Sequence, residues 1–253
     1  MTLPHYIYGL HAVQAALEKE PETLTGLWLE HARRDARAQK LLALAREAGI
    51  EVNRVRREEL DARVGEVRHQ GVVAAATAVS AHDESWLKDF LASLAAPPFL
   101  LVLDGVTDPH NLGACLRTAD AAGVQAVIAP RDRACGLTAT VRKVACGAAE
   151  TVPFVQVTNL ARSLRMLQKQ GVWLTGADAE AEQDIYAADL RGPLALVMGA
   201  EGSGLRRLTR ELCDQLIRLP MCGSVQSLNV SVSTGICLYE ALRQRKASSQ
   251  AKQ

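Results

Sequence analysis

Five polar residues occupy three short segments rich in small side chains: Asn111, Arg117, Glu201, Ser227 and Asn229. Amide, hydroxyl, carboxylate and guanidinium groups of this kind can orient a hydroxyl substrate, contact a phosphate or assist in removing a proton. Each segment follows an apolar run typical of a strand and leads into a helical pattern. Because open α/β proteins build their sites where the carboxyl ends of parallel strands meet, these residues predict one shared catalytic site.

Each segment also has a simpler interpretation when it is taken alone. Asn111 follows a turn sequence, Asp108-Pro109-His110, so it can be explained as the cap of a helix. Arg117 is then either a surface residue or a buried cation, and Glu201 is the candidate partner for a buried one. The glycines at 199, 202 and 204 do not have the dinucleotide spacing G-x-G-x-x-G, and no Lys-Ser or Lys-Thr pair follows them as in a phosphate-binding loop.

Composition limits the class of protein. The chain has 253 residues, of which 48% are hydrophobic and only 4% aromatic, and its formal net charge is +1. It is long enough for one large domain or two modest ones with Ala/Leu/Val cores, and its overall charge does not signal nucleic acid. The six cysteines include no C-x-x-C pair and no zinc-type spacing, so we expect reduced thiols and no metal. With no secretory signal pattern and no long apolar run, we expect a cytoplasmic protein that does not enter a membrane.

Strand and helix patterns alternate along the chain, which is typical of α/β folds. We expect a compact unit over 1–79, a polar linker over 80–97 that ends in two prolines, a larger unit over 98–246, and a polar tail over 247–253. In the first unit the patterns predict helices at 5–20, 34–48 and 58–64, and strands at 24–29, 50–55 and 71–78. In the second they predict strands at 99–104, 124–129, 152–157, 172–177, 194–199 and 215–220, and helices at 112–122, 138–146, 160–170, 205–213 and 230–245.

Positive charge is clustered although the total is close to zero. Arginines and lysines gather at 33–40, 54–57 and 206–210. One such cluster can be a solvated face, but three on one chain favour contacts with RNA phosphates.

Together the three polar segments resemble the motifs of the SPOUT superfamily of RNA methyltransferases, specifically its TrmH-type ribose 2′-O branch. The first motif is an Asn with an Arg six residues later, here Asn111 and Arg117. The second is a Gly-x-Glu-Gly-x-Gly loop, here 199–204, and the third is Pro-Met followed by Ser-Leu-Asn-Val-Ser, here 220–221 and 227–231. All three occur in order at expected strand ends, and the resemblance covers most of residues 98–246.

The N-terminal unit narrows the resemblance. The run Tyr8-Gly9-Leu10-His11-Ala12-Val13, followed by an α/β unit, is similar to an L30e-like RNA-binding domain that is fused to one subgroup of the family. The run at 104–113 resembles the members of that subgroup that act on large-subunit rRNA.

The resemblance implies an α/β protein with an N-terminal L30e-like α/β domain and a C-terminal SPOUT parallel sheet with a deep trefoil knot. It implies a homodimer, with the site at the subunit interface, that uses S-adenosylmethionine to methylate the 2′-oxygen of a guanosine in the peptidyl-transferase P-loop of 23S rRNA. The cofactor would be held by the loops of the second and third motifs, at Gly199, Leu219, Met221 and Leu228, with Thr175 and Gly176 as further candidates.

The resemblance also assigns catalytic roles. Arg117 is the proposed proton acceptor, but because a guanidinium has a pKa above about 12, orienting the hydroxyl and contacting the adjacent phosphate is the alternative role. Glu201 and Asn229 would orient Arg117 and the ribose, while Asn111 and Ser227 would bond to the substrate or to Arg117.

Three other functions are weighed against this one. A tRNA or different rRNA ribose 2′-O-methyltransferase shares all three motifs, so only substrate tests separate it. A catalytically silent RNA-binding or ribosome-assembly protein predicts lost motif residues, whereas Arg117, Glu201 and Asn229 are all present. A nicotinamide-dependent oxidoreductase would need the dinucleotide loop that the glycine spacing does not match.

Overall fold

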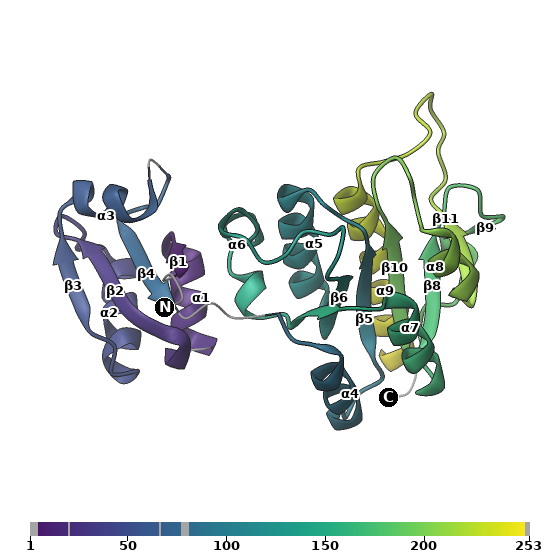
Figure 1. Ribbon diagram of the computed structural model, residues 1–253, viewed down its shortest axis with the longest axis horizontal. Coiled ribbons are helices and arrows are strands. Elements are labelled where there is room, and N and C mark those ends of the chain that lie inside the picture. The colour runs from purple at the N-terminus through teal and green to yellow at the C-terminus, as the bar shows by residue number, and fades with distance from the viewer. Residues whose placement is uncertain (1–4, 20, 66, 77–80, 251–253) are drawn as a thin grey trace. The chain divides into compact units, whose positions relative to one another are not determined.

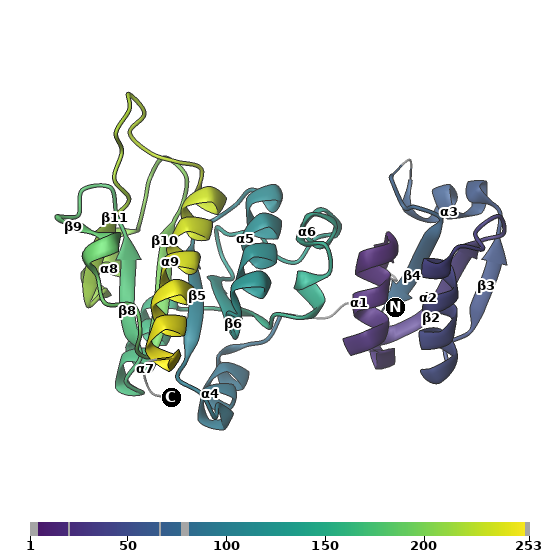
Figure 2. The same ribbon diagram turned by 180° about the vertical axis from the view of Figure 1, so that it is seen from behind.

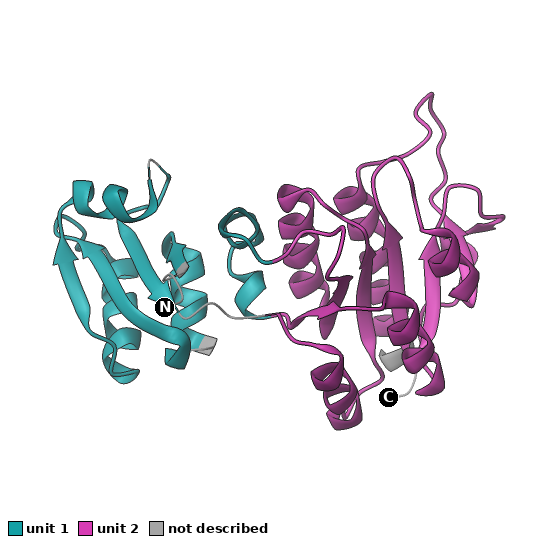
Figure 3. Ribbon diagram, viewed as in Figure 1, with its two compact units in different colours: residues 1–80, 137–151 teal, residues 81–136, 152–253 magenta. Residues whose placement is uncertain are grey.

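The chain forms two α/β units in the computed structural model: residues 1–80 with 137–151, and residues 81–136 with 152–253 (Figure 3). The structure describes residues 5–19, 21–65, 67–76 and 81–250. The segment 137–151 is grouped with the first unit because its helix packs against the strand at 5–8.

The first unit contains a four-stranded mixed sheet in the order β1-β4-β2-β3 (Figure 1). β4 runs antiparallel to β1 and β2, and β2 runs parallel to β3. One face is buried against α1 and α2, and α3 packs on the other. The strands are β1 (His5–Tyr8), β2 (Leu24–Glu30), β3 (Val52–Val55) and β4 (Val72–Ala76). The helices are α1 (Leu10–Lys19), α2 (Ala36–Glu47), α3 (Arg57–Val64) and α6 (Ala139–Ala145), with short 3-10 turns at Pro21–Thr23 and Ala148–Glu150.

The second unit contains a seven-stranded sheet in the order β7-β6-β5-β10-β8-β11-β9, with every pairing parallel. Its strands are β5 (Phe99–Asp104), β6 (Ala126–Pro130), β7 (Phe154–Val157), β8 (Trp173–Ala177), β9 (Gln183–Asp184), β10 (Leu194–Gly199) and β11 (Gln215–Arg218). Its helices are α4 (Glu84–Ser93), α5 (Pro109–Ala122), α7 (Leu160–Lys169), α8 (Arg207–Leu212) and α9 (Val230–Gln250), with a 3-10 turn at Ile185–Ala187.

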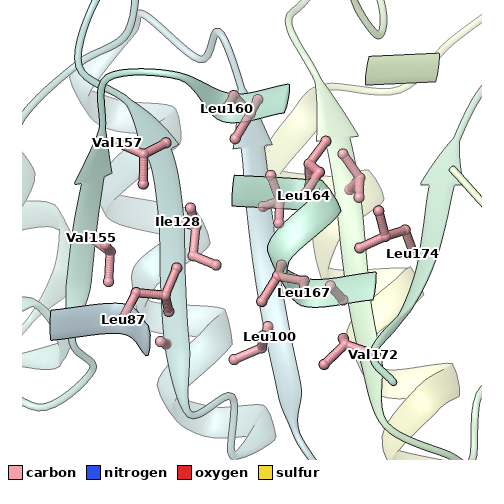
Figure 4. Close-up of a cluster of buried hydrophobic side chains, with 14 of the residues drawn as sticks. Leu87, Leu100, Ile128, Val155, Val157, Leu160, Leu164, Leu167, Val172 and Leu174 are labelled. Carbon is pink, nitrogen blue, oxygen red and sulfur yellow. The ribbon is translucent and has the colours of Figure 1, made fainter. Parts of the chain in front are cut away.

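Helices cover both faces of this sheet. α4 and α7 lie on one face, where leucines of α7 pack with side chains of β5, β6, β7 and β8 (Figure 4). α5 and α9 lie side by side on the other face (Figure 2). Because both faces are covered, all six residues of β5 are buried, as the apolar run in the sequence predicted.

Four segments differ from the sequence-based expectations. Residues 5–8, expected to be helical, form β1, because Gly9 takes a φ of 94° that ends the strand before α1 begins. The expected linker contains α4, whose Leu87 and Leu91 enter the core of the second unit. The short strand β9 was not expected. α9 continues to Gln250, so only 251–253 of the expected tail fall outside the described residues, as do residues 77–78 of the expected strand at 71–78.

Among the described residues, no helix combines the length and the apolar character that crossing a membrane requires.

The cysteines give a test of this fold. Cys115 and Cys237 are buried, and burial raises the pKa of their thiols to about 11 and about 12, whereas Cys146 and Cys222 are exposed. Because the thiolate is the reactive form, we expect iodoacetamide at pH 8 to alkylate Cys146 and Cys222 in the native protein and to reach the buried pair only in urea. Peptide mass mapping measures this, and alkylation of native Cys237 as fast as Cys222 would contradict the packing.

Candidate active site

The carboxyl edge of the parallel sheet brings the three polar segments together. β5 and β10 are neighbours in register, with Asp104 beside Gly199 at their ends. α5 follows β5, and α9 follows the loop after β11. Because α5 and α9 pack side by side, their first turns meet beside the loop after β10.

Asn229 lies at the centre of the resulting polar cluster. Its Nδ2 donates hydrogen bonds to Oδ1 of Asn111, at 3.0 Å, and to Oε1 of Glu201. Its Oδ1 accepts hydrogen bonds from the backbone N–H and the hydroxyl of Ser231, at 2.9 and 2.6 Å. Since a backbone N–H can only donate, it fixes which end of the Asn229 amide is the oxygen. One side chain thus connects all three predicted motifs.

The loop after β10 holds Glu201 on a tight turn. The N–H groups of Ala200 and Gly204 each donate to the other's carbonyl oxygen at 3.0 Å. Gly202 and Gly204 have φ values of 75° and 63°, in the left-handed region that favours glycine. A Cβ on Gly199 would lie 2.1 Å from the carbonyl carbon of Gly204, so the two backbone segments can approach this closely only without a side chain.

A buried carboxylate supports this loop. Asp104, at the end of β5, is fully buried, and its Oδ2 accepts a hydrogen bond from the backbone N–H of Arg206 at 3.0 Å. The Arg206 guanidinium lies 3.5 Å from Oδ1 of Asp104 and compensates its charge. Asp104 therefore anchors the start of α8 to β5, a role that the sequence analysis did not anticipate.

Arg117 lies on a different side of α5 from Asn111. α5 begins at Pro109 with Asp108 as its cap, so Asn111 sits within the first turn and is not the cap residue. Six residues at about 100° each turn Arg117 to another side of the helix, where it is exposed while Asn111 is buried. Glu201 forms a hydrogen bond with Asn229 of the third motif.

A cavity of about 790 Å³ opens beside the cluster. This volume is in the range of small-molecule sites. The loops after β8, β10 and β11 line it, together with α8 and the start of α9. Seven of the residues singled out in the sequence contribute to the lining: Gly199, Glu201, Leu219, Met221, Ser227, Leu228 and Asn229.

Thr175 and Gly176 lie within β8, where the structure gives them packing roles. Thr175 is fully buried, and its hydroxyl accepts a hydrogen bond from Nε2 of Gln215 at 2.8 Å. A Cβ on Gly176 would come within 2.8 to 2.9 Å of the side chains of Cys213, Leu205 and Leu216. The residues that follow them, 177–180, line the cavity.

Sequence reasoning missed four charged residues of the cavity wall: Asp178, Glu180, Arg207 and Arg210. Asp178 and Glu180 directly follow β8, so the rule that singled out the other strand ends would have found them. The two arginines were noted only as part of a basic cluster.

The close approach at Gly199 leads to a stability prediction. We expect Gly199→Ala to lower the free energy of unfolding by at least about 1–3 kcal/mol, because the new methyl group forces the turn open. Urea denaturation measures the change. Gly192→Ala is the matched control, because a Cβ there meets open space and should change stability by less than about 0.5 kcal/mol. Equal effects at the two sites would contradict the geometry of the turn.

Comparison with known proteins agrees with this geometry. The SpoU rRNA Methylase family matches residues 98–239, and a family described as RNA 2′-O ribose methyltransferase substrate binding matches residues 6–81. The 23S rRNA (guanosine-2′-O-)-methyltransferase RlmB of Pseudomonas putida is 58% identical over 95% of this chain and 96% of its own length.

Two solved structures share the fold. The SpoU methyltransferase AviRb from Streptomyces viridochromogenes, in complex with AdoMet, has a TM-score of 0.80 at 24% identity, covering 96% of this chain and 91% of its own. An RNA 2′-O ribose methyltransferase has a TM-score of 0.76 at 27% identity, covering 96% and 89%. With its three motifs gathered around one cavity and its matched region spanning more than half its length, the chain belongs to the SpoU rRNA methylase family.

Proposed function

We propose that this protein transfers a methyl group from S-adenosylmethionine to the 2′-oxygen of a guanosine in 23S rRNA, in the P-loop of the peptidyl-transferase centre. The observation that carries the proposal is the hydrogen-bonded cluster of Asn111, Glu201 and Asn229 beside a cavity lined by the second and third motifs. The relative from P. putida, which is matched over nearly its whole length, is named for 2′-O-methylation of guanosine in 23S rRNA.

The cavity fits S-adenosylmethionine. Apolar side chains of Met198, Leu219 and Leu228 suit an adenine ring, and polar groups of the same wall suit its sugar and amino-acid tail. The missing side chain at Gly199 lets backbone approach a ligand closely. When bound, this cofactor supplies a methyl group that its sulfonium has already activated.

The protein's own task is then to align the ribose hydroxyl with that methyl group and to help remove its proton. Glu201 bonds to Asn229 through one carboxylate oxygen, and a carboxylate has a second oxygen that can accept the ribose hydroxyl. Asn229 fixes Glu201 and Asn111 relative to each other. A guanidinium donates hydrogen bonds and offers no acceptor, so we assign Arg117 to orienting the hydroxyl and contacting the adjacent phosphate.

We further propose a homodimer with the site at the subunit interface. Arg117 is exposed, and α9 beside it exposes Val232 and Tyr239 to 49% and 51%. A second copy that covers this surface would bring the partner's face of α5 toward the cavity. We also infer the deep trefoil knot of SPOUT proteins in the second unit, and a cytoplasmic location, where rRNA is available.

The basic clusters divide between structural and RNA-binding roles. Arg54 donates hydrogen bonds to the carbonyl oxygens of Glu30 and Arg33, so it holds a loop. The arginines at 206–210 pair with carboxylates of the second unit. Exposed arginines of the first unit, Arg34, Arg37 and Arg56, are the better candidates for phosphate contacts.

The substrate is tested by incubating the protein with radiolabelled S-adenosylmethionine and, separately, unmodified 23S rRNA and unmodified tRNA. We expect one label, on the 2′-oxygen of a P-loop guanosine. Label in tRNA alone would overturn the substrate and support the tRNA methyltransferase alternative. No label in either RNA or in assembling large subunits would support the silent RNA-binding protein.

The role of Arg117 is tested by Arg117→Ala. We expect methyl transfer to fall by at least about 100-fold, because the hydroxyl and phosphate lose their orienting group, with cofactor affinity and dimer mass unchanged. Arg165→Ala, at an exposed arginine of α7, is the control and should keep full activity. An active Arg117→Ala enzyme would exclude both roles considered for this residue.

A further inference from the structure

The loop after β8 places two carboxylates, Asp178 and Glu180, on the cavity wall, outside the three motifs. Arg210 of α8 lies on the same wall. These groups are not used in the chemistry described above. Their position on the carboxyl edge of the sheet, directly beside β10, nevertheless brings them into reach of a cofactor in the cavity.

Asp178 holds this loop rigidly. Its Oδ2 accepts a hydrogen bond from Nε of Arg210 at 2.6 Å, and its Oδ1 accepts one from the backbone N–H of Glu180 at 2.8 Å. Its own backbone N–H donates to the carbonyl oxygen of Ile217 at 2.9 Å. The Asp178 side chain is only 13% exposed, and its carboxylate ties the loop to α8, while its backbone N–H ties the loop to β11.

Glu180 differs from Asp178 because its carboxylate extends into the open. Its side chain is 88% exposed, and its Oε2 lies 4.0 Å from Nη2 of Arg210. The backbone at Glu180 is fixed by Asp178, while its carboxylate can accept hydrogen bonds from a ligand. A side chain that recognises a ligand needs a fixed backbone position and an accessible hydrogen-bond acceptor, and Glu180 has both.

The charges near Glu180 favour a neutral partner over a cation. Arg210 offsets the negative charge of Asp178 and Glu180, and Arg207 adds a second guanidinium to the same wall. A ligand ammonium would therefore meet guanidinium groups together with the carboxylates, whereas sugar hydroxyls donate hydrogen bonds without carrying charge. In dinucleotide-binding sheets, an acidic side chain that follows a neighbouring strand likewise accepts hydrogen bonds from ribose hydroxyls.

Position along the sheet supports the same partner. The strand order is β5-β10-β8, so the segment that holds Asn111 and the loop that holds Glu180 follow the two strands on either side of β10. The transferred methyl group must face the Asn111 cluster, and the cofactor's ribose is one carbon from the sulfonium. A cofactor that filled this cavity with its methyl group toward the cluster would extend its ribose along the wall that includes Glu180.

We propose that Glu180 accepts hydrogen bonds from the ribose hydroxyls of the cofactor, and that Asp178 and Arg210 are the positioning residues that hold it there. This inference rests on the proposed function, because it takes the cavity to be the cofactor site. Glu180 would then be a cofactor-binding residue that lies outside the three motifs.

Binding of cofactor analogues tests the proposal without requiring catalysis. Isothermal titration of the full-length protein would compare S-adenosylhomocysteine with its 2′-deoxy and 3′-deoxy forms. We expect the wild type to prefer the hydroxylated ligand by about 10- to 100-fold, the range for a hydrogen bond to a charged group. In Glu180→Ala that preference should fall to nearly one, because only the hydroxylated ligand binds more weakly. Equal weakening of all three ligands would show a merely structural role and overturn the proposal.

A second ligand separates the ribose from the amino-acid tail. 5′-Methylthioadenosine keeps the ribose and lacks the ammonium, so Glu180→Ala should weaken its binding by the same factor as that of S-adenosylhomocysteine. If only S-adenosylhomocysteine binds more weakly, Glu180 reads the ammonium and the proposal is wrong.

Two further variants complete the design. Asp178→Ala should reduce the preference for hydroxylated ligand, and combining it with Glu180→Ala should remove no more than Glu180→Ala alone. Asp189→Ala is the matched control, because Asp189 forms an exposed pair with Arg191, at 2.7 Å, in the same unit but away from this cavity. If wild type binds none of the adenosine ligands, the proposed function itself fails; if it binds them all equally, only the present inference fails.

Discussion

The side-chain amide of Asn229 is the interaction on which the arrangement of the site depends. It joins Asn111 and Glu201, which are 118 and 28 residues away in sequence, and both of its hydrogens are used in doing so. An unsatisfied buried partner such as Asn111 would cost about 1–3 kcal/mol, so the three segments stabilise one another only when all are in place. The site is therefore formed by the tertiary fold as a whole and by no single loop.

The fold supports this amide from two directions. From the sheet, the register of β5 and β10 sets Gly199 beside Asp104, and the buried Asp104 carboxylate fixes the start of α8 beneath the Glu201 loop. From the helices, the packing of α5 on α9 brings Asn111 to Asn229. The Arg206 guanidinium offsets part of the charge of the buried Asp104 carboxylate, whose Oδ1 has no hydrogen-bond partner among the described residues.

In the proposed reaction, the cavity binds the cofactor and the polar cluster of Asn111, Glu201 and Asn229 positions the ribose hydroxyl. Side chains facing the cavity provide an apolar and hydrogen-bonding surface for a cofactor, while the cluster at its rim orients a hydroxyl. Arg117 is exposed on α5, where the proposed dimer would place it beside a second copy of the chain. An exposed arginine and a preformed amide cluster on this chain are consistent with the proposed site at a subunit interface.

Much of the molecule could be predicted from the sequence because the signals are local. Continuous apolar runs identified the buried strands, and the spacing of Asn, Arg, Glu and Gly residues identified the family. Asp178 and Glu180 follow a predicted strand, so the strand-end rule could have found them, whereas Arg210 could not be found because its partner is 32 residues away. Residues 5–8 and α4 were misjudged because a short apolar pattern takes its structure from what it packs against: β4 for one and the core of the second unit for the other. Only the tertiary structure decides such partners, because strand order and helix packing are set by contacts between residues that are distant in the chain.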